Sequence, residues 1–178
     1  ISLESLRSAL TVVPQEPVLF SGSLRDTLDP FRRSSDEEIL DSLRRVELDS
    51  FVTSLPGMLN FRVHEGGSNL SCGQRQLLCL ARALLRDSHI IILDEATANI
   101  DVETDFAIQR TIRREFVGAT VIVVAHRLGT VIDSDLIMVL ERGRLAEFGA
   151  PEHLLGKRDS LLSMFRSEEH TSELQSRQ

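Results

Sequence analysis

Short apolar runs alternate along the chain with longer stretches in which apolar residues recur every three or four positions. The runs occupy Leu10–Val13, residues 89–94 and residues 120–125, and they are rich in β-branched side chains. Uninterrupted runs of this length predict strands that are buried on both faces. Strands of this kind separated by helices indicate an α/β fold, with a mostly parallel sheet covered by helices on both sides.

Two of the helical stretches begin with a capping box, in which a serine is followed three residues later by Glu or Gln. Ser35 and Glu38 open one helix, and Ser71 and Gln74 open another that continues to about residue 86. Apolar residues follow at helical spacing in both stretches, so each helix is expected to bury one face.

Two further helices are predicted between these landmarks. One covers residues 49–55, and the other covers residues 101–116. Phe106, Ile112 and Phe116 are expected to point inward from the second helix.

The last part of the folded sequence is predicted to form a hairpin and a helix. Residues 135–140 and 144–148 have strand character and are joined by the turn Glu141-Arg142-Gly143. Pro151 is expected at the first position of the final helix, where its missing N–H costs nothing.

The pattern also suggests boundaries. Residues 22–86 are mostly helical and lie between two predicted strands, so they are expected to form a lobe inserted into the sheet domain. Residues 1–165 are interpreted as one incomplete domain. Residues 166–178 contain one apolar residue and resemble a translated sequencing-library adaptor, so they are interpreted as an added or disordered tail.

Composition argues against several classes of protein. The 178 residues carry a formal net charge of −7, which argues against nucleic acid as a partner. The longest apolar runs fall far short of the roughly 20 residues that span a bilayer. Cys72 and Cys79 have no neighbouring ligand set for zinc and are interpreted as reduced core thiols. The chain begins at Ile1 without a methionine, which indicates a piece of a longer protein.

The stretch IIILDEAT, residues 90–97, ends a buried strand with two adjacent carboxylates, Asp94 and Glu95. Burying like charges side by side is costly unless a cation or a polarised water accompanies them. Asp94 therefore fits a role on Mg²⁺ or its bound water, and Glu95 fits a base that orients an attacking water. A plain cap at the exit of the strand is the alternative interpretation.

Three other motifs carry candidate chemistry. Ser71 and Gly73 stand at the start of a helix, where backbone N–H groups can receive an anion. His126 and Gln15 each follow a predicted strand directly, as Asp94 does. Ligands of open parallel sheets bind beyond the carboxyl ends of the strands, so these side chains are expected to share one edge. An ordinary helix cap and a histidine of the core or a loop remain the simpler alternatives.

The motifs VVPQEP, LSCGQ, IIILDEAT, ANID and VVAHR occur in the order found in the ATP-binding cassette ATPases, and the chain resembles that family from residue 1 to about residue 165. The resemblance implies a P-loop NTPase-type, RecA-like core. It also implies that Asp94 and Glu95 are the Walker B acid and the catalytic glutamate. By the same resemblance Gln15 is the Q-loop glutamine, His126 the switch histidine, and Asp101 the end of the D-loop.

In that family two such domains pair head to tail around two ATP molecules. The resemblance therefore implies ATP and Mg²⁺ as cofactors, with Asp94 and Gln15 on the metal side. It also implies that Ser71, Gly73 and Gln74 of the LSCGQ signature contact the ATP held by the partner domain.

The stretch EPVLFSGSLRDTLDPF is similar to the multidrug-resistance-protein subfamily, known as subfamily C. The presence of Glu95 favours the second nucleotide-binding domain of that subfamily. The expected partners are then the first nucleotide-binding domain and the membrane-spanning domains. The expected location is the cytoplasmic face of a membrane, and the expected function is ATP-driven export of a solute.

One element of such a site is absent from the 178 residues. A phosphate loop requires G-x-x-x-x-G-K-[ST], and the sole Gly-Lys pair, Gly156-Lys157, is followed by Arg158. The loop is therefore expected upstream of Ile1, and the chain alone is expected to be inactive.

Two alternatives to an exporter stay open at this point. The parent protein could be an ATP-sensing regulator associated with a channel. It could be a soluble cassette ATPase without a membrane partner. A third view, that the chain itself is a fragment with no function of its own, is compatible with an exporter as the parent protein.

Overall fold

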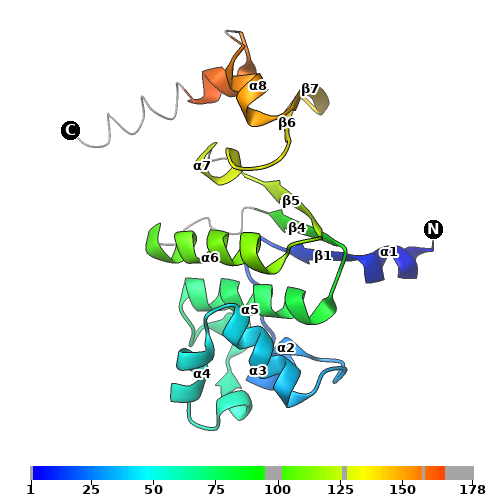
Figure 1. Cartoon of the computed structure of the whole chain (residues 1–178). Helices are drawn as coiled ribbons and strands as arrows, with labels where there is room; N and C mark the ends of the chain where they lie inside the picture. Colours follow the sequence, from blue (N-terminus) through cyan, green and yellow to red (C-terminus); the bar gives the residue numbers. More distant parts are fainter. Residues whose placement is uncertain (1, 95–101, 126–127, 158, 167–178) are drawn as a thin grey trace. The chain divides into compact units, whose positions relative to one another are not determined.

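The computed structural model describes residues 2–94, 102–125, 128–157 and 159–166. Two compact units divide the chain, Ile1–Val124 and Ala125–Gln178 (Figure 1). Each unit has its own hydrophobic core and is described by itself. The expected domain of residues 1–165, its lobe at residues 22–86 and the tail stay predictions.

A parallel three-stranded sheet forms the centre of the first unit. Its order is β1 (Leu10–Val13), β4 (Ile90–Asp94), β5 (Thr120–Val124). Both pairings are parallel, with Val13 opposite Leu93 and Asp94 opposite Val124. The three predicted strands and their parallel arrangement are therefore confirmed.

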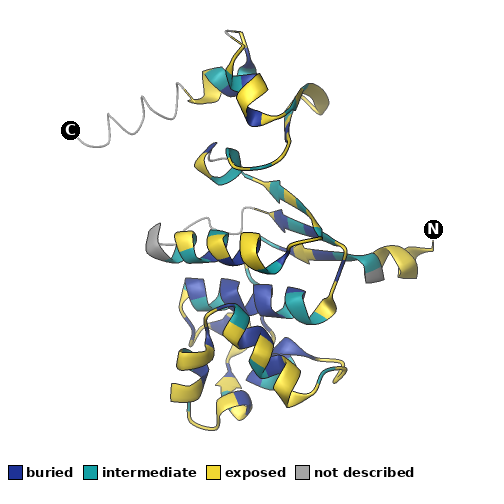
Figure 2. Cartoon of the chain, in the orientation of Figure 1, coloured by how far each residue is buried: buried dark blue, intermediate teal, exposed yellow. Residues whose placement is uncertain are grey.

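Burial alternates along these strands, which differs from the expectation that both faces are covered. Val13, Ile91 and Leu93 are buried, whereas Val12 and Ile122 are about half exposed (Figure 2). Helices α5 (Cys72–Arg86) and α6 (Val102–Glu115) both lie on the side of the buried residues (Figure 1). The sequence could not show this, because the residues of both faces are apolar and each helix is free to choose a side.

The segment between β1 and β4 contains most of the remaining elements of the first unit. In chain order these elements are β2 (Gly22–Ser23), α2 (Leu24–Leu28), α3 (Asp36–Arg45), α4 (Asp49–Ser54), η1 (Met58–Asn60), β3 (Arg62–Val63) and η2 (Glu65–Gly67). The capping box of α3 is present with both of its hydrogen bonds. Helix α2 was not predicted, because its five residues lie within a run of turn formers and depend on the Ser23 side chain as a cap. Helix α1 (Leu3–Ala9), before β1, was also not predicted.

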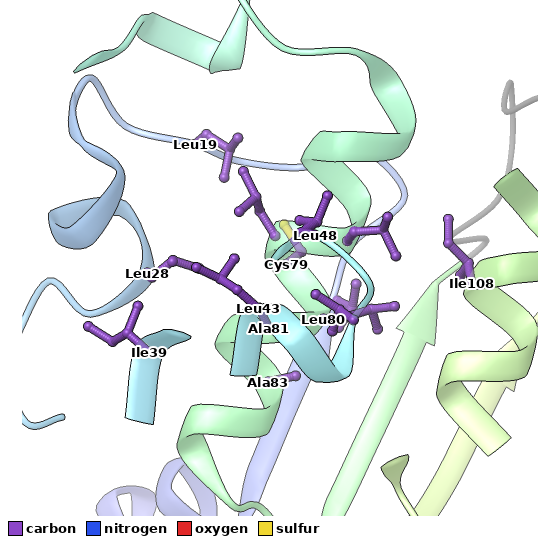
Figure 3. Packing of buried hydrophobic residues seen from close by; sticks show 14 of the residues in the cluster. Leu19, Leu28, Ile39, Leu43, Leu48, Cys79, Leu80, Ala81, Ala83 and Ile108 are labelled. Atoms are coloured by element: carbon purple, nitrogen blue, oxygen red, sulfur yellow. The ribbon is translucent and has the colours of Figure 1, made fainter. Parts of the chain in front are cut away.

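The core of the first unit surrounds α5. Leu28 from α2 and Ile39 and Leu43 from α3 belong to the same buried cluster as Leu80 and Ala83 of α5 (Figure 3). Full burial of an aliphatic side chain contributes about 1.5–3 kcal/mol, so this apolar cluster holds α2 and α3 together with α5.

The prediction that Phe106 points inward from α6 is wrong. Phe106 is 77% exposed, whereas Ile108, Ile112 and Phe116 are buried. Positions 108, 112 and 116 are four residues apart and share a face of the helix. Phe106 is two residues before Ile108, which places it about 200° around the helix, on the opposite side.

An ion-pair network ties the end of α3 to the end of α6. The Arg45 Nε donates to Glu115 Oε2 at 2.6 Å, and the Arg114 Nε donates to Glu115 Oε1 at 2.6 Å. Glu47 accepts from Arg110 at 2.8 Å and from Arg114 at 3.3 Å. Burial alone would raise the pKa of Glu115, but the two arginines outweigh it and lower that pKa. Helices α3 and α6 are thus joined by charge as well as by apolar packing.

The second unit contains the predicted hairpin and final helix. Strands β6 (Ile137–Glu141) and β7 (Arg144–Gly149) pair antiparallel, with Glu141 opposite Arg144. Arg142 and Gly143 form the turn with positive φ of 49° and 75°, as a two-residue hairpin loop requires. Helix α7 (Leu128–Val131) precedes the hairpin, and α8 (Pro151–Leu155) follows it with Pro151 in its first turn. None of the helices within the described residues is long and apolar enough to cross a membrane.

Glu147 of β7 holds the chain that follows α8. Its carboxylate accepts hydrogen bonds from the N–H groups of Leu161 and Leu162 and from the Ser160 hydroxyl, at 2.9 to 3.3 Å. Partial burial would raise the pKa of Glu147, but these donors and the nearby Lys157 outweigh it and lower that pKa below the usual 4.5.

We expect the Leu161 and Leu162 amides to lose protection from hydrogen exchange in acid. A lowered pKa in the folded state means that the carboxylate stabilises the fold above the ordinary pKa of 4.5. That stabilisation is lost as the pH falls through the lowered value. Glu147→Gln should show reduced protection already at pH 7, with Glu152→Gln on α8 as the matched control. Equal protection in the Glu147→Gln and Glu152→Gln variants from pH 7 to pH 3 would contradict this role.

Candidate functional site

The carboxyl ends of β1 and β4 place two predicted site residues at one edge of the sheet. Val13 pairs with Leu93, so Asp94 is the next residue on its strand and Gln15 follows two residues after Val13. Both side chains are exposed, and therefore accessible to a ligand. Carboxylate and amide oxygens are the hard ligands that Mg²⁺ prefers. The edge thus has the position and the donor chemistry expected of a metal–phosphate site.

Three predicted site residues, Glu95, Asp101 and His126, lie outside the described residues. The last described residue before Glu95 is Asp94, which pairs with Val124 of β5. Among the described residues no group of three or more His, Cys, Asp or Glu side chains is placed to hold a metal ion. The assignments of these three residues stay predictions from the sequence.

The N-terminus of α5 is closed by the predicted capping box. The Ser71 Oγ accepts from the Gln74 N–H at 3.1 Å, and the Gln74 Oε1 accepts from the Ser71 N–H at 2.9 Å. The Gln74 Oε1 is thereby occupied, so toward an anion Gln74 offers its Nε2–H₂ group. The cap holds both polar side chains at the positive end of a 15-residue helix, where an anion is favoured.

Gly73, in the first turn of α5, is buried against α6. A Cβ atom built on Gly73 would overlap the methyl group of Thr104 in the first turn of α6. The absence of a side chain at this position is therefore required for the two helix N-termini to lie together. Thr104 is a neighbour of the site that the sequence did not indicate.

The loop before α5 is held by a second glycine and by Arg75. Gly67 has a φ of +67°, and a Cβ on it would come within 2.8 Å of the Leu19 and Arg75 side chains. The Arg75 Nη1 donates to the Leu70 carbonyl at 2.9 Å. These contacts fix the backbone that leads into Ser71.

The segment that contains Gln15 is attached to α5 by side chains of the helix. The Gln76 Nε2 donates to the carbonyl oxygens of Pro14 at 3.4 Å and Gln15 at 3.5 Å, and the Arg82 Nη1 donates to the Val18 carbonyl at 2.9 Å. Gln76 was not among the predicted site residues. The feature that could have indicated it is its position as a polar residue inside the buried stripe of an amphipathic helix.

Both cysteines are free thiols, and the interpretation as a small core residue is confirmed for Cys79 alone. Cys79 is buried, and burial raises the pKa of its thiol although the nearby Arg82 opposes the change. Cys72, in the first turn of α5, is partly buried.

A parallel sheet with an amide and a carboxylate at its carboxyl edge, and a helical segment between β1 and β4, is the arrangement expected of an α/β protein of the P-loop NTPase type. The profile of the family described as ABC transporter matches residues 1–98, which is more than half of the 178 residues. The chain belongs to the ABC transporter family, whose domains bind ATP.

Several curated relatives are members of subfamily C. The chain is 57% identical over 164 residues to rat ATP-binding cassette sub-family C member 2, which covers 92% of this chain and 11% of the relative. It is 59% identical over 155 residues to the human protein of the same description, covering 87% and 10%. A probable multidrug resistance-associated protein of Drosophila melanogaster, lethal(2)03659, is 52% identical over 160 residues, covering 90% and 12%. The predicted resemblance to subfamily C is therefore confirmed.

A solved structure shares the fold. The structure of a bacterial Atm1-family ABC exporter with ATP bound superposes with a TM-score of 0.86 at 36% identity, covering 95% of this chain and 30% of that one. The chain thus spans about a tenth of the curated relatives and less than a third of the exporter chain.

Proposed function

We propose that this chain is part of the second nucleotide-binding domain of a subfamily C exporter, which binds and hydrolyses ATP to drive transport. The observation that carries the proposal is the register of β1 against β4. This register brings Asp94 and the segment of Gln15 to the same edge of the sheet. Glu95, the proposed base, is the residue that follows Asp94 in the sequence. The similarity to subfamily C proteins supports the assignment to an exporter.

The exposed Asp94 carboxylate and the Gln15 amide oxygen fit a hydrated Mg²⁺ by their donor chemistry and their shared position. When bound, the cation neutralises charge on the phosphates of ATP. The role of this chain would be to orient the ion through two oxygen atoms, one from the end of β4 and one from the segment after β1.

The proposed base is Glu95. As the residue after the metal acid, its carboxylate would accept a proton from the attacking water. We assign His126, which follows the strand at residues 120–124, to the γ-phosphate, where an imidazole N–H can donate a hydrogen bond.

The first turn of α5 is proposed to serve a second ATP, held by the first nucleotide-binding domain in a head-to-tail pair. Ser71 and Gln74 retain O–H and N–H donors beyond the capping box, and Gly73 lies between them in the same turn, where its N–H group is proposed to serve the anion. Asp101 would lie at the contact between the two domains.

Exposed apolar side chains near the Gln15 segment suit contact with membrane-spanning domains. Val18 and Phe20, which follow Gln15 closely in the chain, are 55% and 71% exposed. These two apolar side chains are available to a protein partner that would cover them. This contact would place the domain on the cytoplasmic face of the membrane.

The proposal is tested by the Mg²⁺ dependence of ATP turnover in the full-length protein. Asp94→Asn should raise the Mg²⁺ concentration for half-maximal turnover by about tenfold or more, because one charged group is lost from around the hydrated ion. The matched control is Asp87→Asn. Asp87 is exposed at the end of α5 with a φ of 47°, a conformation that asparagine accepts readily.

Two results would contradict the proposed function. The first is a full-length protein that shows no Mg²⁺-dependent ATP hydrolysis. The second is an Asp94→Asn variant whose Mg²⁺ dependence matches that of Asp87→Asn.

A further inference from the structure

Gln76 is a polar residue in a position that the helix pattern reserves for apolar ones. It is 1% exposed and lies on the same buried stripe of α5 as Gly73, Leu77 and Leu80. Burying a side-chain amide without hydrogen bonds costs several times more than burying a methyl group gains. A glutamine at this position therefore needs polar partners inside the first unit.

Two of the partners of Gln76 are main-chain atoms of the segment after β1. Its Nε2 donates to the Pro14 and Gln15 carbonyl oxygens at 3.4 and 3.5 Å. Both distances are long, so each bond is weak and the donor is shared between two acceptors. The stronger Arg82 bond to Val18, three residues later, anchors the far end of the same segment. The two weak bonds of Gln76 and the Arg82 bond thus attach both ends of the segment at residues 14–18 to α5.

We infer that Gln76 is a positioning residue that links the backbone of Gln15 to the first turn of α5. The inference rests on the proposed function, in which Gln15 serves one ATP and the turn from Ser71 to Gln74 serves the other. Gln76 is two residues beyond Gln74 on the same rigid helix. A displacement of the Gln15 backbone would therefore be passed by the Gln76 side chain to the turn from Ser71 to Gln74, which serves the second ATP.

The contrasting explanation is that Gln76 only stabilises the fold. Both explanations predict that its loss lowers the midpoint of thermal unfolding. Both also predict looser backbone at residues 15–18, where the bonds of Gln76 end. Only the positioning role predicts a change in turnover per folded molecule.

The first experiment is hydrogen exchange of the backbone amides in the full-length protein. Gln76→Met keeps the length and apolar stem of the side chain but removes the donor. It should speed exchange at residues 15–18 by about three- to tenfold, the equivalent of one ordinary hydrogen bond. Gln109→Met, a half-buried glutamine of α6, is the matched control and should leave that segment unchanged. If Gln76→Met does not fold, Gln76→Leu provides the same comparison.

The second experiment measures ATP turnover of the same variants. Gln76→Met should lower kcat about fivefold or more with KM for ATP within about twofold, because Gln15 is misplaced after ATP has bound. Gln109→Met should resemble the wild type. Exchange at residues 15–18 that is the same in the Gln76→Met and wild-type proteins would overturn the inference, as would equal kcat values for the Gln76→Met and Gln109→Met variants. Exchange that responds in a protein without ATPase activity would instead overturn the proposed function and leave the structural link intact.

Discussion

Replacing Glu95 by glutamine in the full-length protein should reduce steady-state ATP hydrolysis by about 10²- to 10⁴-fold, the usual contribution of a general base. The substitution preserves the shape of the side chain and removes only its capacity to take a proton. Asp94 remains in place for the metal, so binding of MgATP should persist. Hydrolysis is measured as phosphate release, and binding as retention of a labelled nucleotide.

The matched control for this substitution is Glu37→Gln on the exposed first turn of α3. It removes the same charge from a residue that is more than 50 positions away from Glu95 in the chain and is not among the predicted site residues. Its hydrolysis should equal that of the wild type. Turnover of the Glu95→Gln protein within about threefold of the control would remove Glu95 from the role of base, since a general base contributes far more than this.

Replacing Gly73 by alanine should lower turnover of the full-length protein about 10²-fold, the effect of misplacing site groups by about 1 Å. The added Cβ would overlap the Thr104 methyl group, so the first turns of α5 and α6 must separate. Overpacking of this kind also costs about 1–3 kcal/mol of stability. Thermal unfolding and phosphate release measure the two effects.

The double substitution Gly73→Ala with Thr104→Ser separates packing from function. Serine keeps the hydroxyl of Thr104 and removes the methyl group that the new Cβ would meet; the next Thr104 atoms lie 3.5 and 3.6 Å away. Stability should return in the double variant. Turnover of the double variant that stays low after stability has returned would mean that Gly73 is also required at the nucleotide, apart from its contact with Thr104. Gly73→Ala alone with unchanged stability would contradict the observed contact.

Local signals were sufficient for the helix starts at Ser35 and Ser71 and for the strands of the sheet. A capping box is complete within four residues, and an apolar run carries its own periodicity. The positions of Gln15 and Asp94 at the ends of their strands follow from the same local patterns.

Other features depended on contacts between distant residues. The 101–116 stretch was correctly predicted as a helix, but its buried face was assigned through Phe106 instead of Ile108. Several residues of that helix are apolar, and the choice of face is made by the packing against α5. The five-residue helix α2 likewise depends on a side-chain cap and on a core that forms around it.

The sequence by itself determined the α/β class, the family and the candidate chemistry of Asp94, Glu95, Gln15 and His126, because each of these depends on residues that are adjacent in the chain. The sequence also led to the expectation that Asp94 and Gln15 share an edge, but only the tertiary structure decided that β1 and β4 are neighbours and in which register they pair. The tertiary structure also decided that α5 and α6 cover the same face of the sheet, that Gly73 meets Thr104, and that Gln76 holds the segment of Gln15. These contacts join residues dozens of positions apart, and their geometry is set by the packing of whole elements, which no local pattern encodes.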